Sequence, residues 1–487
     1  MAERSTVTGS ATTSSAAAGS APAGSAPAGG TDPVRRRGYR LMAGLLVVVM
    51  LGGTLPIPLY VLYERQMGFG PLGVTVVFAA YVIGTLSALV MFGDLSDHIG
   101  RRKVLAVGVG CAAVSTSGFL IASGIAPGIG LLIAARIVSG LAAGFVTGTA
   151  TAALAELQPR GDRQAAAVVA SGANMTGLGL GPLIAGLFAA YVALPTRGVF
   201  WFYLGLCALA LVALKVIPET VRDPVQRISL RPRLGAPPQM RAAVLGACLG
   251  VFAAFSILGF FSSLVPTFLH GILGVANLAL IGAASFLVFI TAAITQAASA
   301  RLPAYRSMST GLPLLLVCLA ALESALFARA LWLFLAGTVI GGVAVGLIFR
   351  SGLSEINRLA EPRRRAAVVS TFFAAAYLGL GLPPVLTGLI SQAVGTVDAS
   401  AWTSGITGLI VAAAIVVVLR AFGAPRSAMP PSTPSDSWCC PAEPADLLRS
   451  RADLVRARPG SYPERAVVLV HCRGFRAVVK RVERGLG

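Results

Sequence analysis

Long apolar runs, separated by short polar or charged stretches, make up most of this 487-residue chain. A run of about 20 apolar residues is long enough to cross the hydrocarbon core of a bilayer as a helix. The pattern therefore predicts an all-α membrane protein with twelve transmembrane helices. The expected spans are residues 40–63, 71–93, 103–125, 128–155, 164–192, 198–218, 242–269, 276–299, 308–328, 331–353, 366–394 and 401–421.

Composition and charge support this interpretation. Hydrophobic residues make up 56% of the chain and charged residues only 12%, whereas a soluble domain carries about 25% charged residues. The net charge of +20 would suit a nucleic-acid partner, but the inter-helix loops on one side hold only Arg65, Arg197 and Arg329, and those on the other side are rich in arginine. This asymmetry is typical of the positive-inside rule. We expect a multi-pass protein of the plasma (inner) membrane with both termini in the cytoplasm, contacting lipid and no nucleic acid.

The spacing of glycines and prolines repeats along the chain. Gly140 recurs as Gly342 and Pro182 recurs as Pro384, in both cases 202 residues later. Such an internal repeat predicts two pseudo-symmetric six-helix bundles. The expected domains are a disordered cytoplasmic N-terminal tail at 1–37, an N-terminal bundle at 38–218, a cytoplasmic linker at 219–241, a C-terminal bundle at 242–421 and a largely disordered cytoplasmic tail at 422–487.

Residue types that build reactive sites are scarce. None of the lysines, Lys103, Lys215 and Lys480, follows a glycine, so a phosphate-binding Gly-Lys-Ser/Thr loop is excluded. The seven cysteines show neither a disulfide framework nor metal-ligand spacing, and the three histidines lie far apart in sequence. We expect no catalytic residues, no cofactor, no metal site and no enzymatic activity.

The loop between the second and third spans carries a family pattern. Residues 93–103 read Gly-Asp-Leu-Ser-Asp-His-Ile-Gly-Arg-Arg-Lys. This segment resembles the loop signature Gly-x-Leu-Ala-Asp-Arg-x-Gly-Arg-Lys of the major facilitator superfamily, with Ser96 and His98 as the substitutions. The resemblance implies a transporter with twelve helices in two bundles, similar to the twelve-helix bacterial drug:proton antiporters.

The same resemblance implies a latch between the bundles at the cytoplasmic face. Asp97 would meet the start of the eleventh span near Ala366, and Arg101 would reach Glu156 at the end of the fourth span. A topology signal without a mechanical role is the alternative interpretation. The expected latch residues are Gly93, Asp97, Gly100, Arg101, Arg102 and Glu156.

The fifth span contains a glycine-rich stretch. Residues 177–186 resemble the family's antiporter motif Gly-x3-Gly-Pro-x2-Gly-Gly, with Ala185 at the penultimate glycine. A glycine stripe allows another helix to approach closely, and proline removes a backbone hydrogen bond and bends its helix. The alternative is close packing without a transport role. The expected functional residues are Gly177, Gly181, Pro182 and Gly186.

One arginine lies deep within an apolar run. Arg136 and Ser139 resemble the family's fourth-span motif Arg-x2-Gln-Gly, in which the arginine is linked to proton coupling. A charge at this depth costs at least ~2.5 kcal/mol and normally faces an interior or a water-filled cavity; snorkelling to the interface is the alternative. Glu323 is the only carboxylate well inside a span, and Glu64 lies at the outer end of the first span. These three residues are the proton-coupling candidates, and facilitated diffusion stays open as an alternative.

Together these features predict a monomeric secondary transporter that works by alternating access. We expect it to export small hydrophobic or amphiphilic molecules, with protons as the candidate coupling ion, because the spans hold few polar side chains. A permease or uniporter for a metabolite such as a sugar is the alternative. A non-transporting membrane receptor or scaffold is the alternative from another functional class.

Overall fold

The computed structural model describes residues 33–92, 95–124, 128–194, 196–221, 235, 240–359 and 365–423, and these residues form helices and loops without a strand. Most of the predicted tails and of the predicted 219–241 linker lies outside the described residues. The helices of the first half are α1 (Pro33–Thr54), α2 (Tyr60–Met67), α3 (Pro71–Phe92), α4 (Leu95–Ile99), α5 (Arg101–Ala122), α6 (Ile129–Leu157), α7 (Arg163–Tyr191) and α8 (Gly198–Val216). The second half contains α9 (Arg241–Ser263), α10 (Val265–Gly271), α11 (Leu278–Ala298), the 3₁₀ helix η2 (Ser299–Arg301), α12 (Ala304–Ala328), α13 (Leu331–Leu359), α14 (Arg365–Val394) and α15 (Thr396–Gly423).

Eleven of the described helices are long and apolar enough to cross a membrane. They are α3, α5 to α9 and α11 to α15, and they confirm the prediction of an all-α membrane protein. The predicted first span, 40–63, is not among them because α1 ends at Thr54. The count of twelve therefore stays a prediction.

Prolines account for the interruption of the first predicted span. Pro56 and Pro58 have no backbone N–H and cannot donate the hydrogen bonds that would continue α1. Between them, Ile57 N donates to Thr54 O at 3.0 Å, a tighter turn than an α-helix makes. The helix resumes as α2 at Tyr60. A similar break separates α9 from α10 at Leu264, so the predicted 242–269 span is also two helices.

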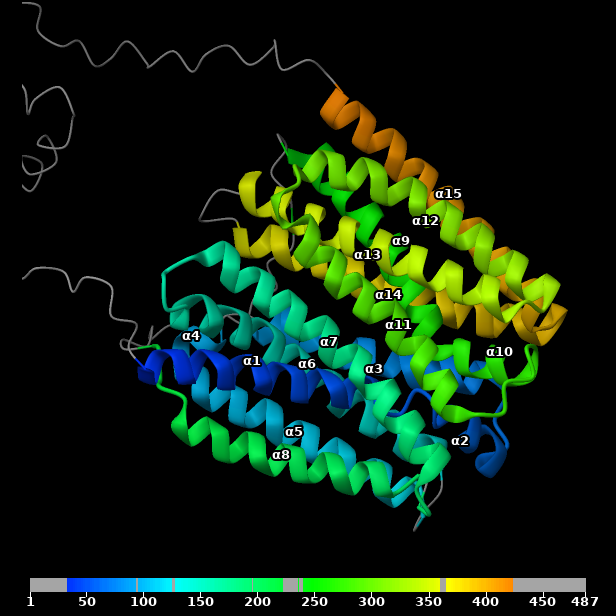
Figure 1. Cartoon of the computed structure of the whole chain (residues 1–487), viewed down its shortest axis with the longest axis horizontal. Helices are drawn as coiled ribbons and strands as arrows, with labels where there is room; N and C mark the ends of the chain where they lie inside the picture. Colours follow the sequence, from blue (N-terminus) through cyan, green and yellow to red (C-terminus); the bar gives the residue numbers. More distant parts are fainter. Residues whose placement is uncertain are drawn as a thin grey trace, which may run out of the picture. The chain divides into compact units, whose positions relative to one another are not determined.

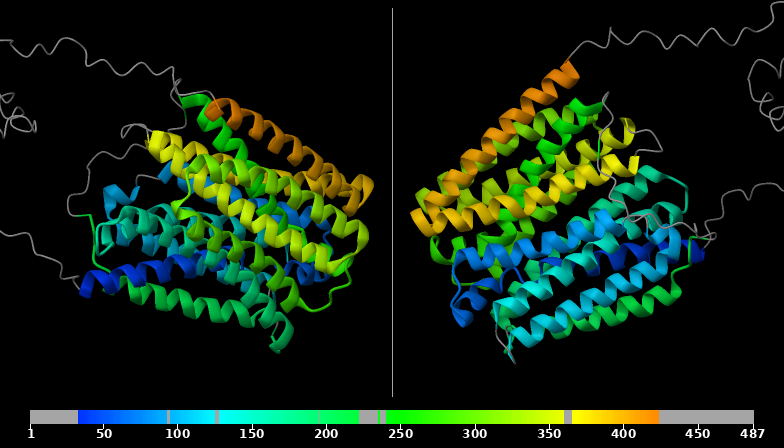
Figure 2. Two further views of the ribbon diagram at one scale, coloured as in Figure 1. Left: turned by 45° about the horizontal axis from the view of Figure 1, so that its top comes forward. Right: turned by 180° about the vertical axis from the view of Figure 1, so that it is seen from behind.

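The two halves pack as neighbouring groups of helices. Figures 1 and 2 show α1 to α8 on one side and α9 to α15 on the other. The interface is formed mainly by α7 against α11 and by α14 against α3. Because α7 corresponds to α14 and α3 to α11 in the 202-residue repeat, the interface is itself pseudo-symmetric.

Glycines allow equivalent helices to approach closely in both halves. A Cβ on Gly140 of α6 would lie 2.1 Å from the carbonyl oxygen of Tyr81 on α3. The repeated position, Gly342 of α13, is equally crowded: a Cβ there would lie 2.7 Å from the carbonyl oxygen of Val288 on α11. Only glycine permits backbones to pack at these distances.

The two ends of the molecule differ in charge. We call the end that holds α4 and Arg101, Arg102 and Lys103 the basic end, and the opposite end, where α2 and α10 lie, the far end (Figure 1). Trp201, Trp332 and Trp402 are exposed near the far-end starts of α8, α13 and α15. Exposed tryptophans at one level are typical of a membrane–water interface.

The packing of α7 against α11 predicts unequal effects of two similar substitutions on α7. A Cβ on Gly186 would lie 2.5 Å from the Leu278 carbonyl oxygen, whereas Gly172 has no neighbouring atom within 4 Å. Gly186→Ala should lower the free energy of unfolding by about 1–3 kcal/mol through overpacking. Gly172→Ala should leave the free energy of unfolding unchanged or raise it. Melting temperatures measured in one detergent test this, and equal values for the two variants would contradict the packing.

Candidate functional site

Arg136 is buried completely in the first half. Its Nη1 donates to the carbonyl oxygen of Gly53 at 2.6 Å, its Nε donates to the Tyr60 hydroxyl at 2.7 Å, and its Nη2 also donates to that hydroxyl. The guanidinium carbon lies 5.3 Å from the centre of the Tyr60 ring and 5.7 to 5.9 Å from the rings of Phe78, Tyr81 and Phe119. Arg136 therefore faces the interior and does not snorkel to the interface.

The break in the first predicted span supplies the acceptors for this charge. In a continuous helix, the Gly53 carbonyl would accept from the backbone N–H of Ile57, but that N–H donates to Thr54 instead. The freed carbonyl points to Arg136, and Tyr60 begins α2 beside it. Among the described residues, no carboxylate forms an ion pair with Arg136. Rings around a desolvated guanidinium supply cation–π attraction in place of a counter-ion.

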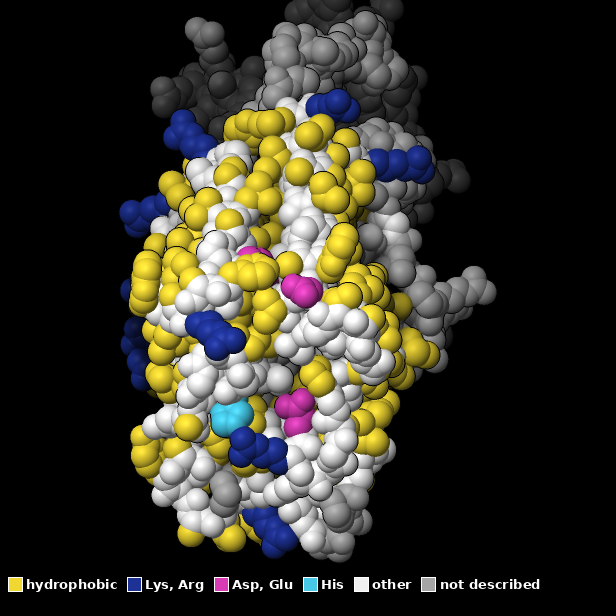
Figure 3. Space-filling view, turned by 90° about the vertical axis from the view of Figure 1, so that its right-hand side faces the viewer, with side chains coloured by type: hydrophobic (Ala, Val, Ile, Leu, Met, Phe, Trp, Pro, Cys, Tyr) yellow, Lys and Arg dark blue, Asp and Glu magenta, His cyan; other side chains and the backbone are white. Residues whose placement is uncertain are grey.

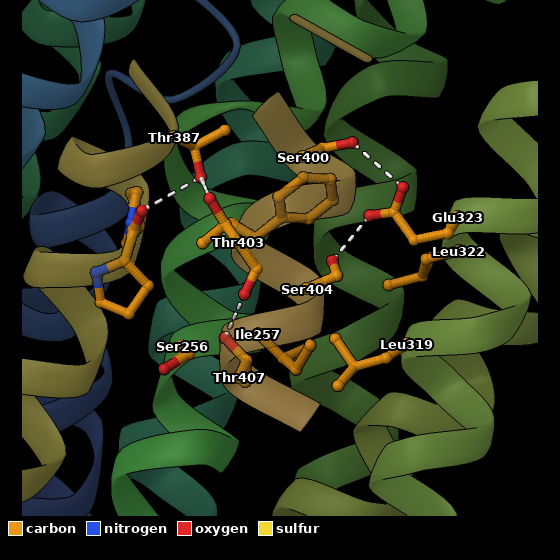
Figure 4. A pocket seen from close by; sticks show the side chains of 13 residues that line it. Ser256, Ile257, Leu319, Leu322, Glu323, Thr387, Ser400, Thr403, Ser404 and Thr407 are labelled. Atoms are coloured by element: carbon orange, nitrogen blue, oxygen red, sulfur yellow. Dashed lines mark hydrogen bonds between the residues drawn. The ribbon is translucent and has the colours of Figure 1, made fainter. Parts of the chain in front are cut away.

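Glu323 lines a cavity of about 30 Å³ in the second half, enough for one or two water molecules. Figure 4 shows its carboxylate on α12 pointing toward two hydroxyls of α15. Ser404 Oγ lies 2.6 Å from Oε1, and Ser400 Oγ lies 3.1 Å from Oε2. Thr387 of α14 and Thr403 of α15, 2.9 Å apart, line the same cavity. Glu323 has no ion-pair partner among the described residues, and Arg329, which follows the end of α12, is not paired with it.

The basic end holds the predicted pair of Arg101 and Glu156, with an Nη2–Oε1 distance of 2.9 Å. Arg101 also donates to the Ser96 hydroxyl, and Glu156 accepts from the hydroxyl of Thr220. The contact joins the start of α5 to the end of α6 and to the segment that follows α8. It lies within the first half, and a latching role for it stays a prediction.

Glu219 caps α5 and was not anticipated from the sequence. Its carboxylate accepts from the backbone N–H groups of Arg101 and Arg102, each at 3.0 Å. Partial burial raises the pKa of Glu219, but hydrogen bonds from backbone N–H groups outweigh it, so the pKa lies below its ordinary value. Gly100 makes room for this cap: its φ is 99°, and a Cβ there would lie 3.0 Å from Glu219 Oε2. Few residues other than glycine adopt that backbone conformation.

The glycine motif of α7 packs against other helices on two sides. A Cβ on Gly177 or Gly181 would lie 2.6 or 2.4 Å from carbonyl oxygens of α1, so these residues pack inside the first half. Pro182 and Gly186 face the second half: a Cβ on Gly282 of α11 would lie 2.3 Å from the Pro182 carbonyl oxygen. Pro182 of α7 therefore lies against α11, at the interface of the halves.

The structure brings together some predicted residues and leaves others undescribed. Gly93 and the side chain of Asp97 lie outside the described residues, so the predicted contact near Ala366 is not tested. Glu64 lies one turn after Tyr60 on α2 and, among the described residues, forms no ion pair with Arg136; it receives a hydrogen bond from Thr267 of α10 at 3.2 Å. Among the described residues, no three His, Cys, Asp or Glu side chains are grouped as metal ligands.

The Arg136 contacts predict a specific loss in Tyr60→Phe. This variant keeps the ring but removes the acceptor for two guanidinium N–H groups, so the free energy of unfolding should fall by about 1–3 kcal/mol. Tyr63→Phe, on the same helix, is the matched control. It removes the contact of the Tyr63 hydroxyl with the Ser123 hydroxyl, but Ser123 keeps its bond to the Phe119 carbonyl at 2.7 Å. Thermal unfolding in detergent compares the two. A larger loss in Tyr63→Phe would refute this assignment.

The cap by Glu219 predicts a pH-dependent effect. A lowered pKa means that the folded state favours the carboxylate, so its contribution is present above the ordinary value of 4.5 and is lost as the pH falls below it. Glu219→Gln should melt below the wild type at pH 7, by an amount corresponding to about 1 kcal/mol or less because the side chain is exposed. The gap should begin to narrow as the pH falls below 4.5 and should close only once the pH is below the lowered pKa of the folded state. A gap that is the same at every pH would contradict the cap.

Comparisons with known proteins agree with this architecture. Over 162 residues the chain is 27% identical to a triacylglyceride transporter of Mycolicibacterium hassiacum, covering 32% of this chain and 29% of the relative. Over 184 residues it is 26% identical to the multidrug transporter AQR1 of Candida glabrata, covering 38% and 30%. The matches thus span under a third of the length of these curated relatives.

The fold is similar to that of a solved transporter. The human organic anion transporter MFSD10 (TETRAN) superimposes with a TM-score of 0.59 at 18% identity, covering 80% of this chain and all of that one. The sequence model of the Major Facilitator Superfamily matches residues 42–328. That range is more than half of the chain and includes Arg136, the α7 glycine motif and Glu323. The chain belongs to the Major Facilitator Superfamily.

Proposed function

We propose that the protein is a secondary transporter that exports small hydrophobic or amphiphilic compounds in exchange for protons. Glu323 is the group that would carry the proton. The observation that supports this most directly is a half-buried carboxylate inside a membrane-spanning helix, surrounded by hydroxyls and with no cation paired to it among the described residues. A charge in such a place is costly unless it can be neutralised.

The hydrogen bonds at Glu323 suit both of its protonation states. The Ser400 hydroxyl lies 2.8 Å from the carbonyl oxygen of Val397 and 3.1 Å from Glu323 Oε2, but it has one hydrogen to give. When Glu323 is protonated, its own O–H can donate to Ser400 while Ser400 donates to Val397, so every group is satisfied. When Glu323 is ionised, the Ser404 hydroxyl still donates to Oε1 at 2.6 Å.

The cavity that holds Glu323 is also lined by α14, one of the helices at the interface between the halves. Pro383 and Pro384 of α14 line it, and Thr387 donates to the Pro383 carbonyl oxygen at 3.0 Å. The same helix packs against α3 of the other half, where a Cβ on Gly388 would lie 2.4 Å from Thr75 Oγ1. A change of charge at Glu323 would therefore be felt by α14. Because α14 also packs against the first half, a shift of this helix would change how the two halves pack.

Two observations favour apolar or amphiphilic substrates. The curated relatives include a triacylglyceride transporter and a multidrug transporter, whose named substrates are apolar or chemically varied. The described spans also hold few charged side chains, with Arg136 buried completely and Glu323 half-buried. A nutrient permease would need more polar groups to replace the hydration of a sugar.

We further propose that the basic end faces the cytoplasm and that the Arg101–Glu156 pair belongs to a latch there. The loops at that end are rich in arginine, as the positive-inside rule requires of cytoplasmic loops. Gly93, Asp97, Gly100, Arg102 and Glu219 would complete the latch. Each exposed contact contributes about 1 kcal/mol or less, which is sufficient to bias two states that differ by a few kcal/mol.

Transport by purified protein in liposomes tests the proton assignment. With a fluorescent hydrophobic cation as substrate and an imposed pH gradient, wild-type protein should move the dye against its own gradient. Glu323→Gln keeps the shape and hydrogen bonding of the side chain but cannot lose a proton. It should reduce gradient-driven transport at least about tenfold, one decade for each 1.4 kcal/mol of lost coupling, and should retain exchange of labelled for unlabelled substrate.

Glu355→Gln is the matched control. Glu355 lies on α13 and forms an ion pair with Arg358 at 2.5 Å, so it is not free to cycle its charge, and gradient-driven transport should survive its replacement. Full transport by Glu323→Gln would exclude Glu323 as the proton carrier. Absence of any pH effect in the wild type would exclude proton exchange altogether.

A further inference from the structure

At the far end, one short helix from each half meets the other. The helix α2 follows the break in the first predicted span, and α10 follows the break at Leu264. They pack against each other. Figure 3 shows this end of the molecule, where a histidine, basic side chains and acidic side chains gather on a face that is otherwise hydrophobic or neutral. Both helices are short pieces that follow a break in the helix before them.

Two side-chain contacts join α2 to α10. Arg65 Nη2 lies 2.5 Å from His270 Nε2, and Thr267 Oγ1 donates to Glu64 Oε2 at 3.2 Å. A third contact between the halves lies nearby in sequence, where Asn277 Nδ2 approaches the Tyr191 hydroxyl at 3.5 Å. The first two contacts join residues 205 and 203 positions apart in the chain, and the third joins residues 86 positions apart.

The Arg65–His270 contact requires a neutral imidazole. His270 Nδ1 lies 3.1 Å from the carbonyl oxygen of Val275, which can only accept, so Nδ1 carries a hydrogen. In the neutral ring, Nε2 is then an acceptor and can receive a hydrogen from the Arg65 guanidinium. A protonated ring carries hydrogens on both nitrogens. His270 Nε2 would then be a donor on a positively charged ring, facing the Arg65 guanidinium, which is also a donor and positively charged, so the contact would become repulsive.

The charged groups around His270 offer little compensation. On α2 they are Arg65 and Glu64, and Glu64 is held by Thr267 on the side of α10. The helix α11 carries no charged residue, and α9 carries only Arg241 at its opposite end. The helix α12, whose Leu326 packs against Phe268, carries Arg306 at its opposite end and Glu323, which is bonded to hydroxyls of α15, and it is followed by Arg329. Burial raises the pKa of Glu64, although its bond from Thr267 partly offsets this.

We propose that Arg65 and His270, assisted by Glu64 and Thr267, form the gate that closes the far end, and that protonation of His270 opens it. Histidine is the side chain whose charge ordinarily changes between about pH 5 and 8, so acidification on the far side drives the opening. The gate rests on the proposed alternating access, but its opening is a property of the protein alone and requires neither a substrate nor Glu323.

A distance measurement tests the gate separately from transport. Spin labels placed by Gln66→Cys on α2 and Gly271→Cys on α10, both exposed positions, report the separation of the two helices in full-length protein lacking its native cysteines and held in nanodiscs without substrate. At pH 8 the short distance should dominate. At pH 5.5 the ratio of open to closed protein should rise roughly fivefold, the shift that one exposed charge contact produces.

Two variants assign the response. His270→Gln keeps an acceptor for Arg65 but does not titrate, so it should stay closed at both pH values. Arg65→Leu removes the donor and should be open at both. A wild-type distance that ignores pH would overturn the gate, and a full pH response in His270→Gln would overturn the role of His270. Glu323→Gln should retain the pH response, so a failure of proton-driven transport and a failure of the gate give different results.

Discussion

A fully buried guanidinium, held by the broken end of a helix, is the constraint on which the first half depends. Arg136 cannot shed its charge and has no carboxylate partner among the described residues, so it needs neutral acceptors. The Gly53 carbonyl and the Tyr60 hydroxyl serve because the chain leaves the helix between them. The interruption in the first predicted span is therefore part of the arginine site, and Phe78 on α3 and Phe119 on α5 complete its surroundings.

The helices could be predicted well because the bilayer permits few alternatives. Apolar runs of sufficient length predicted every long helix among the described residues. The repeat of Gly140 as Gly342 predicted two pseudo-symmetric bundles, and the two glycines make equivalent close contacts in the structure. The prolines were harder to interpret. Pro182 remains inside a continuous α7, whereas Pro56 and Pro58 end α1. In both places another group takes a free carbonyl: Thr54 Oγ1 donates to Leu178 O, four residues before Pro182, at 2.8 Å, and Arg136 donates to Gly53 O at 2.6 Å. A single sequence does not reveal which of these prolines ends its helix.

The candidate site was predictable only in its charged members. Arg136 and Glu323 are conspicuous because each interrupts an apolar run. Their partners carry no such signal: Ser400 and Ser404 lie 77 and 81 residues from Glu323, and hydroxyl side chains are too common in spans to identify. The cap by Glu219 depends on the path of the chain after α8, which periodicity does not describe. The far-end contact of His270 was missed for the same reason.

The two halves share a packing plan but carry charges of different kinds, and this difference has a consequence for mechanism. The repeat places Thr338 where the first half has Arg136, and Thr338 is buried with its hydroxyl bonded to the Phe334 carbonyl at 2.8 Å. The first half thus holds a permanent charge, because a guanidinium does not lose its proton in proteins. The second half holds Glu323 and His270, whose side chains can change charge. Glu323 lies in the last turns of α12, at the same end as α10, so in the proposed mechanism a proton that enters from the far end meets His270 and Glu323 in the second half. The second half, together with Glu64 of α2, would then respond to protons, and the Arg136 site would keep its charge throughout the cycle.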